Sequence, residues 1–198
     1  LEIKSEPWTG PGKIKVLHGG WLKMSCAAGD TSVDLENDVG GALNLTQIVK
    51  VRDYTAGYNY NANVISGNGA LQVYGTFTPK TAYFTGATMM DGSMIDISAK
   101  TLPWSAQSGF SSGNQLKIAA GANIAIRLPE GIVIPEDTEE VIVVTNLCDN
   151  VNIDVSRITC DLSGVTMENG GSSANIRLFS SGTGLVLKKI PGLAITVR

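Results

Sequence analysis

The chain has 198 residues, a net charge of −3, 43% hydrophobic residues and only 17% charged residues. A chain this rich in apolar residues is not disordered, and its length corresponds to one elongated domain or two small ones. No apolar run reaches the roughly 18 residues that cross a bilayer, and the basic residues are scattered, so we expect neither membrane insertion nor nucleic-acid binding. A basic start followed by an apolar segment is absent, so we expect any export signal to be missing from this sequence.

Strand patterns recur along the whole chain, whereas helical periodicity is nearly absent. Short runs of aliphatic and β-branched residues mostly lie close to Gly, Asn or Asp, and turn signals return every roughly 8–12 residues, as in all-β folds. The sequence therefore predicts an all-β chain. The predicted strands cover residues 14–17, 21–24, 33–35, 45–51, 70–77, 94–97, 116–119, 124–128, 141–144, 151–155, 158–162, 176–179, 185–187 and 193–197.

Three stretches begin with glycine and continue into alternating aliphatic residues: 67–77, 86–98 and 121–128. The first two begin 19 residues apart, close to one coil of a parallel β-helix, in which stacked coils bury each other's apolar faces. The third begins 35 residues after the second, so residues 99–115 would form an excursion. This pattern favours a parallel β-helix, with an antiparallel β-sandwich as the alternative.

We expect a single elongated β-domain over residues 1–198. Within it, the patterns separate an N-terminal cap with strands (1–66), repeat-like coils (67–135) and C-terminal strands (136–198). The acidic stretch 136–140 precedes the most apolar strand of the chain. Charges beside an aggregation-prone strand act as gatekeepers, so this stretch needs no catalytic explanation.

The stretch 67–98 resembles the glycine-rich repeats in passenger domains of bacterial autotransporters and in related surface or phage-fibre β-helix proteins. Such repeats combine glycine-containing corners with short alternating aliphatic strands. The resemblance implies a right-handed parallel β-helix that is displayed on, or extends from, a cell surface or a phage particle, and it carries no catalytic signature. The matching residues are Gly69, Leu71, Val73, Gly75, Thr76, Phe77, Phe84, Gly86, Ala87, Asp91, Gly92, Ser93, Ile95, Asp96 and Ile97.

The three cysteines, Cys26, Cys148 and Cys160, cannot all pair within one chain. Cys148 and Cys160 could bridge neighbouring strands, or all three could be small buried side chains of a β core. His18 is the only histidine and no CxxC pair occurs, so we expect no metal site and no cofactor. Abundant Gly, Asn, Ser and Thr with little charge is more typical of an extracellular or cell-surface protein than of a cytosolic enzyme.

Paired carboxylates are the one source of catalytic chemistry that the sequence offers. Glycoside hydrolysis needs two carboxyl groups about 5 to 9 Å apart, and neighbouring coils could present such a pair. The structural interpretation, which we favour, is that these acids lie in turns or on solvated outward faces and are not catalytic. The candidate catalytic residues are Asp91, Asp96, Asp154 and Asp161.

Tyrosines and asparagines alternate in one stretch of the chain, which is a pattern that can bind sugars. Extended backbone would place Tyr58 and Tyr60 on one face and the asparagines on the other. Tyrosine rings could stack on a sugar while amides bond to its hydroxyls; alternatively, the tyrosines cover the edge of the core. The candidate ligand-binding residues are Tyr54, Tyr58, Tyr60, Asn59 and Asn61.

Taken together, these patterns favour a non-catalytic structural or adhesion domain, extracellular or on a particle surface. Its expected partners are surface glycans or other protein chains, with no oligomeric state implied. The alternative is a polysaccharide-acting β-helix enzyme, a lyase or glycosidase, that uses paired carboxylates. An enzyme should show a groove in which carboxylates from adjacent coils converge, whereas a display domain should show them dispersed.

Overall fold

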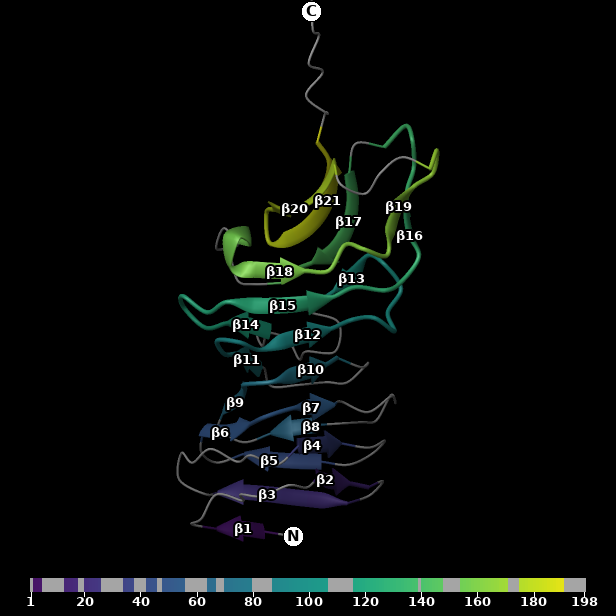
Figure 1. Cartoon of the computed structure of the whole chain (residues 1–198). Helices are drawn as coiled ribbons and strands as arrows, with labels where there is room; N and C mark the ends of the chain where they lie inside the picture. Colours follow the sequence, from purple (N-terminus) through teal and green to yellow (C-terminus); the bar gives the residue numbers. More distant parts are fainter. Residues whose placement is uncertain are drawn as a thin grey trace, which may run out of the picture.

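The computed structural model is all-β and is built mainly from parallel sheets (Figure 1). Its described part contains no α-helix, and it includes the 3-10 turn Val155–Arg157. The predicted all-β class is therefore confirmed. The structure describes residues 2–4, 13–17, 20–25, 34–37, 42–45, 48–55, 64–66, 70–79, 87–106, 116–138, 140–147, 154–170 and 175–190.

The longest sheet, here called the long sheet, has seven strands that are all parallel. In spatial order they are β18 (Ile158–Cys160), β15 (Ile124–Arg127), β12 (Met94–Asp96), β10 (Thr76–Thr78), β7 (Tyr54–Thr55), β4 (Asp34–Asn37) and β2 (Lys13–Val16).

Two four-stranded parallel sheets complete much of the stack. The flank sheet contains β14 (Leu116–Ile118), β11 (Ala87–Met89), β9 (Ala70–Val73) and β6 (Ile48–Val51). The base sheet contains β1 (Glu2–Lys4), β3 (Trp21–Ser25), β5 (Ala42–Leu45) and β8 (Val64–Ser66). A parallel pair, β16 (Ile132–Ile134) and β19 (Val165–Met167), lies nearer the C-terminus.

The chain contributes a strand to the long sheet at intervals along its length. We call each stretch from one strand of the long sheet to the next a layer. Between β7 and β10, for example, the chain passes through β8 of the base sheet and β9 of the flank sheet. Successive layers stack in register: Tyr54 pairs with Phe77, and Phe77 pairs with Ile95. In Figure 1 the stack rises from β1 beside the N-terminus to β18.

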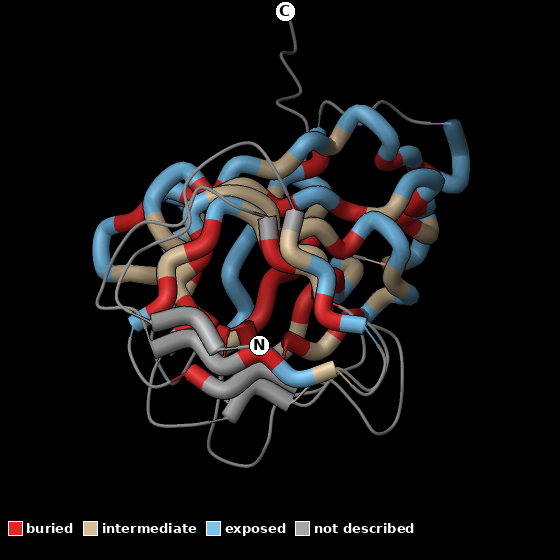
Figure 2. Tube along the Cα trace, turned by 90° about the horizontal axis from the view of Figure 1, so that it is seen from below, coloured by how far each residue is buried: buried red, intermediate tan, exposed pale blue. Residues whose placement is uncertain are grey.

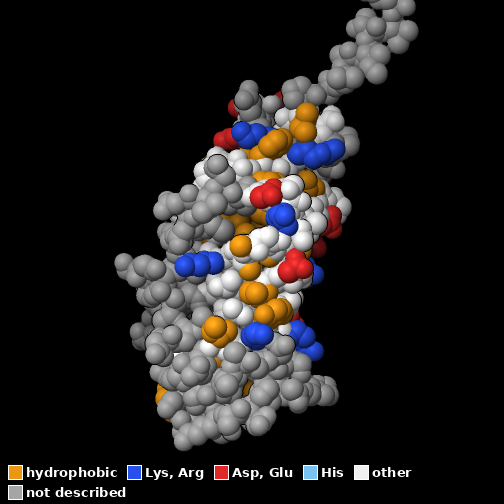
Figure 3. Space-filling view, turned by 90° about the vertical axis from the view of Figure 1, so that its left-hand side faces the viewer, with side chains coloured by type: hydrophobic (Ala, Val, Ile, Leu, Met, Phe, Trp, Pro, Cys, Tyr) orange, Lys and Arg blue, Asp and Glu red, His pale blue; other side chains and the backbone are white. Residues whose placement is uncertain are grey.

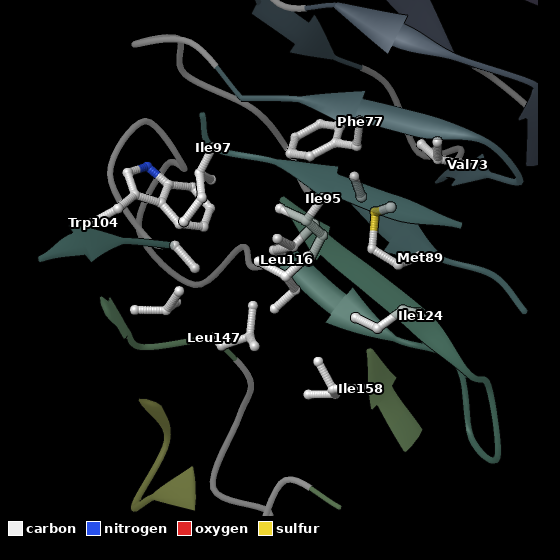
Figure 4. Close-up of a cluster of buried hydrophobic side chains, with 14 of the residues drawn as sticks. Val73, Phe77, Met89, Ile95, Ile97, Trp104, Leu116, Ile124, Leu147 and Ile158 are labelled. Atoms are coloured by element: carbon white, nitrogen blue, oxygen red, sulfur yellow. The ribbon is translucent and has the colours of Figure 1, made fainter. Parts of the chain in front are cut away.

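Apolar side chains of every layer meet in the middle of the stack. Because side chains alternate across a strand, Leu71 and Val73 of β9 are buried while Gln72 between them is half-exposed. Figure 2 shows buried residues lining the interior of the trace and exposed ones its outside. Figure 4 shows the labelled side chains of this core, among them Phe77, Ile95 and Leu116, converging between the sheets.

The layers differ in length, so the 19-residue spacing does not determine how they stack. A 19-residue repeat would stack Met90 on Leu71, but the structure pairs Ala87 with Leu71 and then Leu116 with Ala87. The longer layer comes from the segment predicted as an excursion. Its described part contains β13 (Trp104–Ser105), and the Trp104 ring is buried in the core.

Two of the predicted strands are each divided between strands of different sheets. The predicted strand 45–51 is divided between Leu45 and Ile48, and the predicted strand 70–77 is divided at Tyr74 and Gly75. A Cβ on Gly75 would lie 2.5 Å from the Arg52 carbonyl oxygen, so only glycine lets consecutive layers approach this closely. The Asp53 carboxylate of the layer below accepts a hydrogen bond from the Thr76 backbone N–H at the same corner.

A cap sheet with antiparallel pairing covers the C-terminal end of the stack. Its order is β13, β17 (Glu140–Thr145), β21 (Gly184–Lys189) and β20 (Ile176–Ser181), and β17, β21 and β20 pair antiparallel. Among the described strands, antiparallel pairing occurs only in this cap sheet, so the described strands as a whole do not form an antiparallel β-sandwich.

The predicted strand 151–155 differs from the structure at its described end. There the Asp154 side chain caps a 3-10 turn that begins at Val155. The predicted strand 193–197 lies outside the described residues.

Candidate binding groove on the long sheet

A groove of about 800 Å³ lies over the C-terminal half of the long sheet. The register aligns Met94, Ala125 and Thr159 of β12, β15 and β18, and each contributes to its lining. Ala125 carries only a methyl group, so the sheet surface is low at this point. The wall is formed where β15 and β18 end, by the corners 128–131 and 161–165.

Charged side chains of both signs line the groove. The Arg127 guanidinium donates a hydrogen bond from Nη1 to Asp96 Oδ2, at 3.2 Å, across the β12–β15 pair. Ile126 pairs with Cys160, so the residues that follow them, Arg127 and Asp161, occupy neighbouring positions of successive layers. Glu130 lines the same space from the corner after β15.

Hydroxyl groups complete the lining. Ser98 Oγ donates to Asp96 Oδ1 at 2.6 Å, and Thr159 Oγ1 donates to the Ile124 carbonyl oxygen at 3.3 Å. Both hydroxyl oxygens retain acceptor capacity toward the groove. With Ser163 and the charged groups, they form the polar part of a lining that also includes the apolar side chains of Met94, Leu128 and Val165.

Three of the four candidate carboxylates share one local motif, Asp-x-Ser. Asp96 accepts bonds from the Ser98 N–H and hydroxyl, and Asp154 does the same with Ser156. Asp161 accepts the Ser163 N–H at 2.9 Å. Bonds from the two serines hold the pKa of Asp154 and of Asp161 below the usual range of a carboxyl group.

The fourth candidate, Asp91, joins two layers. Its Oδ1 accepts the Asn123 backbone N–H at 2.8 Å and the Asn123 amide at 3.1 Å. These bonds lower the pKa of Asp91, and the nearby Arg157 guanidinium adds to the effect. Arg157 itself contacts Asp154 at 3.4 Å and donates to the Gly121 carbonyl at 2.6 Å.

The structure therefore places the four candidates in two regions. Asp161 lines the groove, and Asp96 reaches it through Arg127. Asp91 and Asp154 lie at the opposite corner of the layers, around Arg157. Sequence reasoning missed Arg127 and Glu130; the available signal was a charged outward position at the end of an alternating strand, followed by a Pro-Glu-Gly corner.

Tyr54, one of the predicted ligand-binding residues, lies in the core and not on the surface. Tyr54 is fully buried, and its ring stacks on Phe77 of the next layer with 6.1 Å between centroids and 15° between the planes. The alternation of β7 turns this side chain inward, so it belongs to the core. The other predicted ligand-binding residues, Tyr58, Tyr60, Asn59 and Asn61, lie outside the described residues.

An exposed tyrosine that the sequence analysis did not select lies on the flank sheet. Tyr74 follows β9 and is 40% exposed; the Lys50 ammonium lies 5.8 Å from its ring centroid, and its hydroxyl donates to Gln72 Oε1 at 3.4 Å. Figure 3 looks onto the side of the molecule where β6, β9 and β11 carry their labels in Figure 1. Hydrophobic side chains form a band there with basic and acidic groups beside it.

The thiol of Cys160 is free and partly buried. Burial, followed by the charge of Asp161, raises its pKa to about 11, so the thiol is protonated at neutral pH. Cys26, Cys148 and His18 lie outside the described residues.

The described residues contain neither a metal-binding cluster nor a membrane-spanning helix. They hold no group of three or more His, Cys, Asp or Glu side chains that could bind a metal ion. They also include no helix that is long and apolar enough to cross a membrane.

No family model, curated protein or solved structure matches this chain.

Proposed function

We propose that the layers are the coils of a right-handed parallel β-helix. The support is the repeated return of the chain to one sheet, always parallel and in register. Parallel crossover connections are right-handed in about 98% of cases, because of the twist of the strands. The resemblance of the stretch 67–98 to autotransporter passenger repeats agrees with this architecture.

The β-helix serves as a non-catalytic structural and adhesion module on the surface of a cell or a particle. The observation that carries this proposal is the state of the candidate carboxylates. Each accepts hydrogen bonds from its own corner or from the next layer, and bonds of this kind lower the pKa of Asp91, Asp154 and Asp161. A glycosidase needs one carboxyl group that stays protonated near neutral pH, and these three are ionised there.

The groove is the part of the surface best suited to hold a glycan. Sugars carry many hydroxyl groups, which form hydrogen bonds with the carboxylates, guanidinium groups and hydroxyls of a protein. Arg127, Glu130 and Asp161 supply charged partners, and Ser98, Thr159 and Ser163 supply neutral ones. A volume of about 800 Å³ lies within the range of roughly 300–1,000 Å³ usual for ligand sites.

A glycan array probed with the purified protein tests this function. The groove variant Ala125→Tyr fills the floor between Met94 and Thr159 without changing any charge. Lys189→Ala is the matched control, because Lys189 is exposed at the end of β21, away from the groove. We expect binding that Ala125→Tyr abolishes and Lys189→Ala preserves. An array without any bound glycan would remove the adhesion role.

One observation favours the enzymatic alternative, because Glu130 and Asp161 both line the groove and come from successive layers. Glu130 and Asp161 would then be the pair of catalytic carboxyl groups. A reducing-end assay on the polysaccharides that bind decides between the two functions. Release of sugar that Glu130→Gln abolishes would establish the enzyme, and stable binding without product would establish the adhesin.

A further inference from the structure

The groove contains more negative than positive charges. Its described part contains one cation, Arg127, and that guanidinium already pairs with Asp96 at 3.2 Å. The carboxylates of Glu130 and Asp161 are left without a balancing cation among the described lining residues. Asp161 keeps its charge because the Ser163 N–H holds its pKa below the usual range.

The hydrogen-bonding capacity of the groove is equally one-sided. An ionised carboxylate only accepts hydrogen bonds, and Glu130 and Asp161 together offer four oxygens. The hydroxyl protons of Ser98 and Thr159 are directed to Asp96 and to the Ile124 carbonyl, so these two side chains also face the groove as acceptors. Among the lining side chains, donors remain on Arg127 and on the Ser163 hydroxyl. A ligand that fits this groove must therefore bring donors.

A hollow with an excess of one sign of charge concentrates the potential of that charge, and the excess here is the negative charge of Glu130 and Asp161. A uronate or sulfated sugar would bring further acceptors and further negative charge toward Glu130 and Asp161. A sugar with a free amino group would bring an ammonium with three donors, together with its hydroxyl groups. Both electrostatics and hydrogen bonding therefore select the same chemistry.

Building on the proposed glycan contact, we propose that the groove over β12, β15 and β18 binds glycans with free amino groups and discriminates against acidic glycans. Glu130 and Asp161 bind the ammonium, and Arg127 orients the sugar through its hydroxyls. The charged lining residues thus determine which class of glycan binds. The small side chain of Ala125 leaves the space in which the glycan lies.

Three oligosaccharides of equal length test this inference by titration against the purified protein: chitosan, its N-acetylated counterpart chitin, and oligogalacturonate. We expect chitosan to bind about tenfold more tightly than chitin, oligogalacturonate to bind most weakly, and the difference to shrink as salt is raised. This order is measured on the unaltered protein, so it does not depend on a variant folding.

Two substitutions locate the effect. Glu130→Gln combined with Asp161→Asn should bring chitosan to the affinity of chitin. Asp137→Asn is the control, because Asp137 is exposed and lies outside the groove. Equal weakening by the control would show non-specific attraction and overturn the inference.

The outcomes also separate this inference from the proposed function. Tight oligogalacturonate binding that Ala125→Tyr abolishes would keep the glycan-binding function and overturn the preference for amino sugars. Failure of every glycan to bind, on the array and in titration, would remove the function itself.

Discussion

Gly75 allows two layers to approach closely, because its side chain is a hydrogen atom where any other residue would carry a Cβ. Gly75→Ala would place a methyl group 2.5 Å from the Arg52 carbonyl oxygen, against backbone that cannot rotate away. We expect a loss of about 1–3 kcal/mol in the free energy of unfolding, as for other overpacked sites. Chemical denaturation followed by circular dichroism measures this loss.

Gly164→Ala is the matched control for Gly75→Ala. A Cβ at Gly164 would meet only the Glu130 Cα, at 4.0 Å, which is ordinary contact. We expect a change within about 0.5 kcal/mol, as for other tolerated surface substitutions. Equal losses in the two variants would show that the close approach at Gly75 is not what requires a glycine there.

The raised pKa of Cys160, about 11, predicts slow reaction with thiol reagents at neutral pH. The thiolate is the reactive form, so the rate of alkylation should still be rising with pH where an ordinary thiol, with a pKa of about 8.5, has levelled off. A variant with Cys26→Ser and Cys148→Ser isolates the signal. Mass spectrometry over a pH series gives the rate, and a plateau near pH 8.5 would contradict the burial of this side chain.

At the scale of strands, the alternation of apolar and polar residues predicted most of the strands. The ends and the pairing of the strands depend instead on contacts between layers. Leu71 and Val73 flank Gln72 in a pattern that identifies β9 from the sequence alone. Nothing in that pattern shows that the strand turns at Gly75, because the constraint is the Arg52 carbonyl of another layer. The pairing of Leu71 with Ala87 was unpredictable for the same reason: it depends on contacts between layers of unequal length.

The candidate site, too, could be predicted from the sequence only in part. The sequence identified Asp96 and Asp161 as acids of interest, because acids are conspicuous in a chain poor in charge. It could not identify the groove, since its walls come from segments at least 30 residues apart in the sequence, the corners 128–131 and 161–165. Tyr54 was misassigned because an isolated tyrosine pattern does not show which face of a strand is inward.

The hairpin of β20 and β21 supplies a prediction about the end of the stack. Leu187 is fully buried between Val141 of β17 and Leu178 of β20, its partners in the cap sheet. Leu187→Ala should lower the free energy of unfolding by about 2–5 kcal/mol, as in other cores. Phe179→Ala, at a position that is 39% exposed in the same hairpin, should cost much less. Thermal unfolding of both variants makes the comparison, and similar losses would place the hairpin outside the core.

For the whole molecule, the corner carboxylates predict how stability responds to acid. The pKa values of Asp91, Asp154 and Asp161 are lowered in the folded state, so the unfolded chain binds protons first as the pH falls. Their stabilisation is complete above about pH 5 and is lost progressively below about pH 4. Melting temperatures over this range should fall, and Asp91→Asn should fall less steeply because one titrating group is gone. Identical slopes would contradict the role of Asp91.

The polar bonds at the corners have a mechanical consequence. Asp53 contacts Thr76, Asp91 contacts Asn123 and Arg157 contacts Gly121, so each bond ties a layer only to the next. In such a stack, stability is a sum of nearest-neighbour terms. Tension applied to the two ends of the chain would then be released in discrete steps. Because the layers have unequal lengths, the steps would be unequal: the layer between Asp96 and Arg127, 31 residues apart, would free about 100 Å of chain. The molecule would behave as a tether that yields gradually and limits the force it transmits.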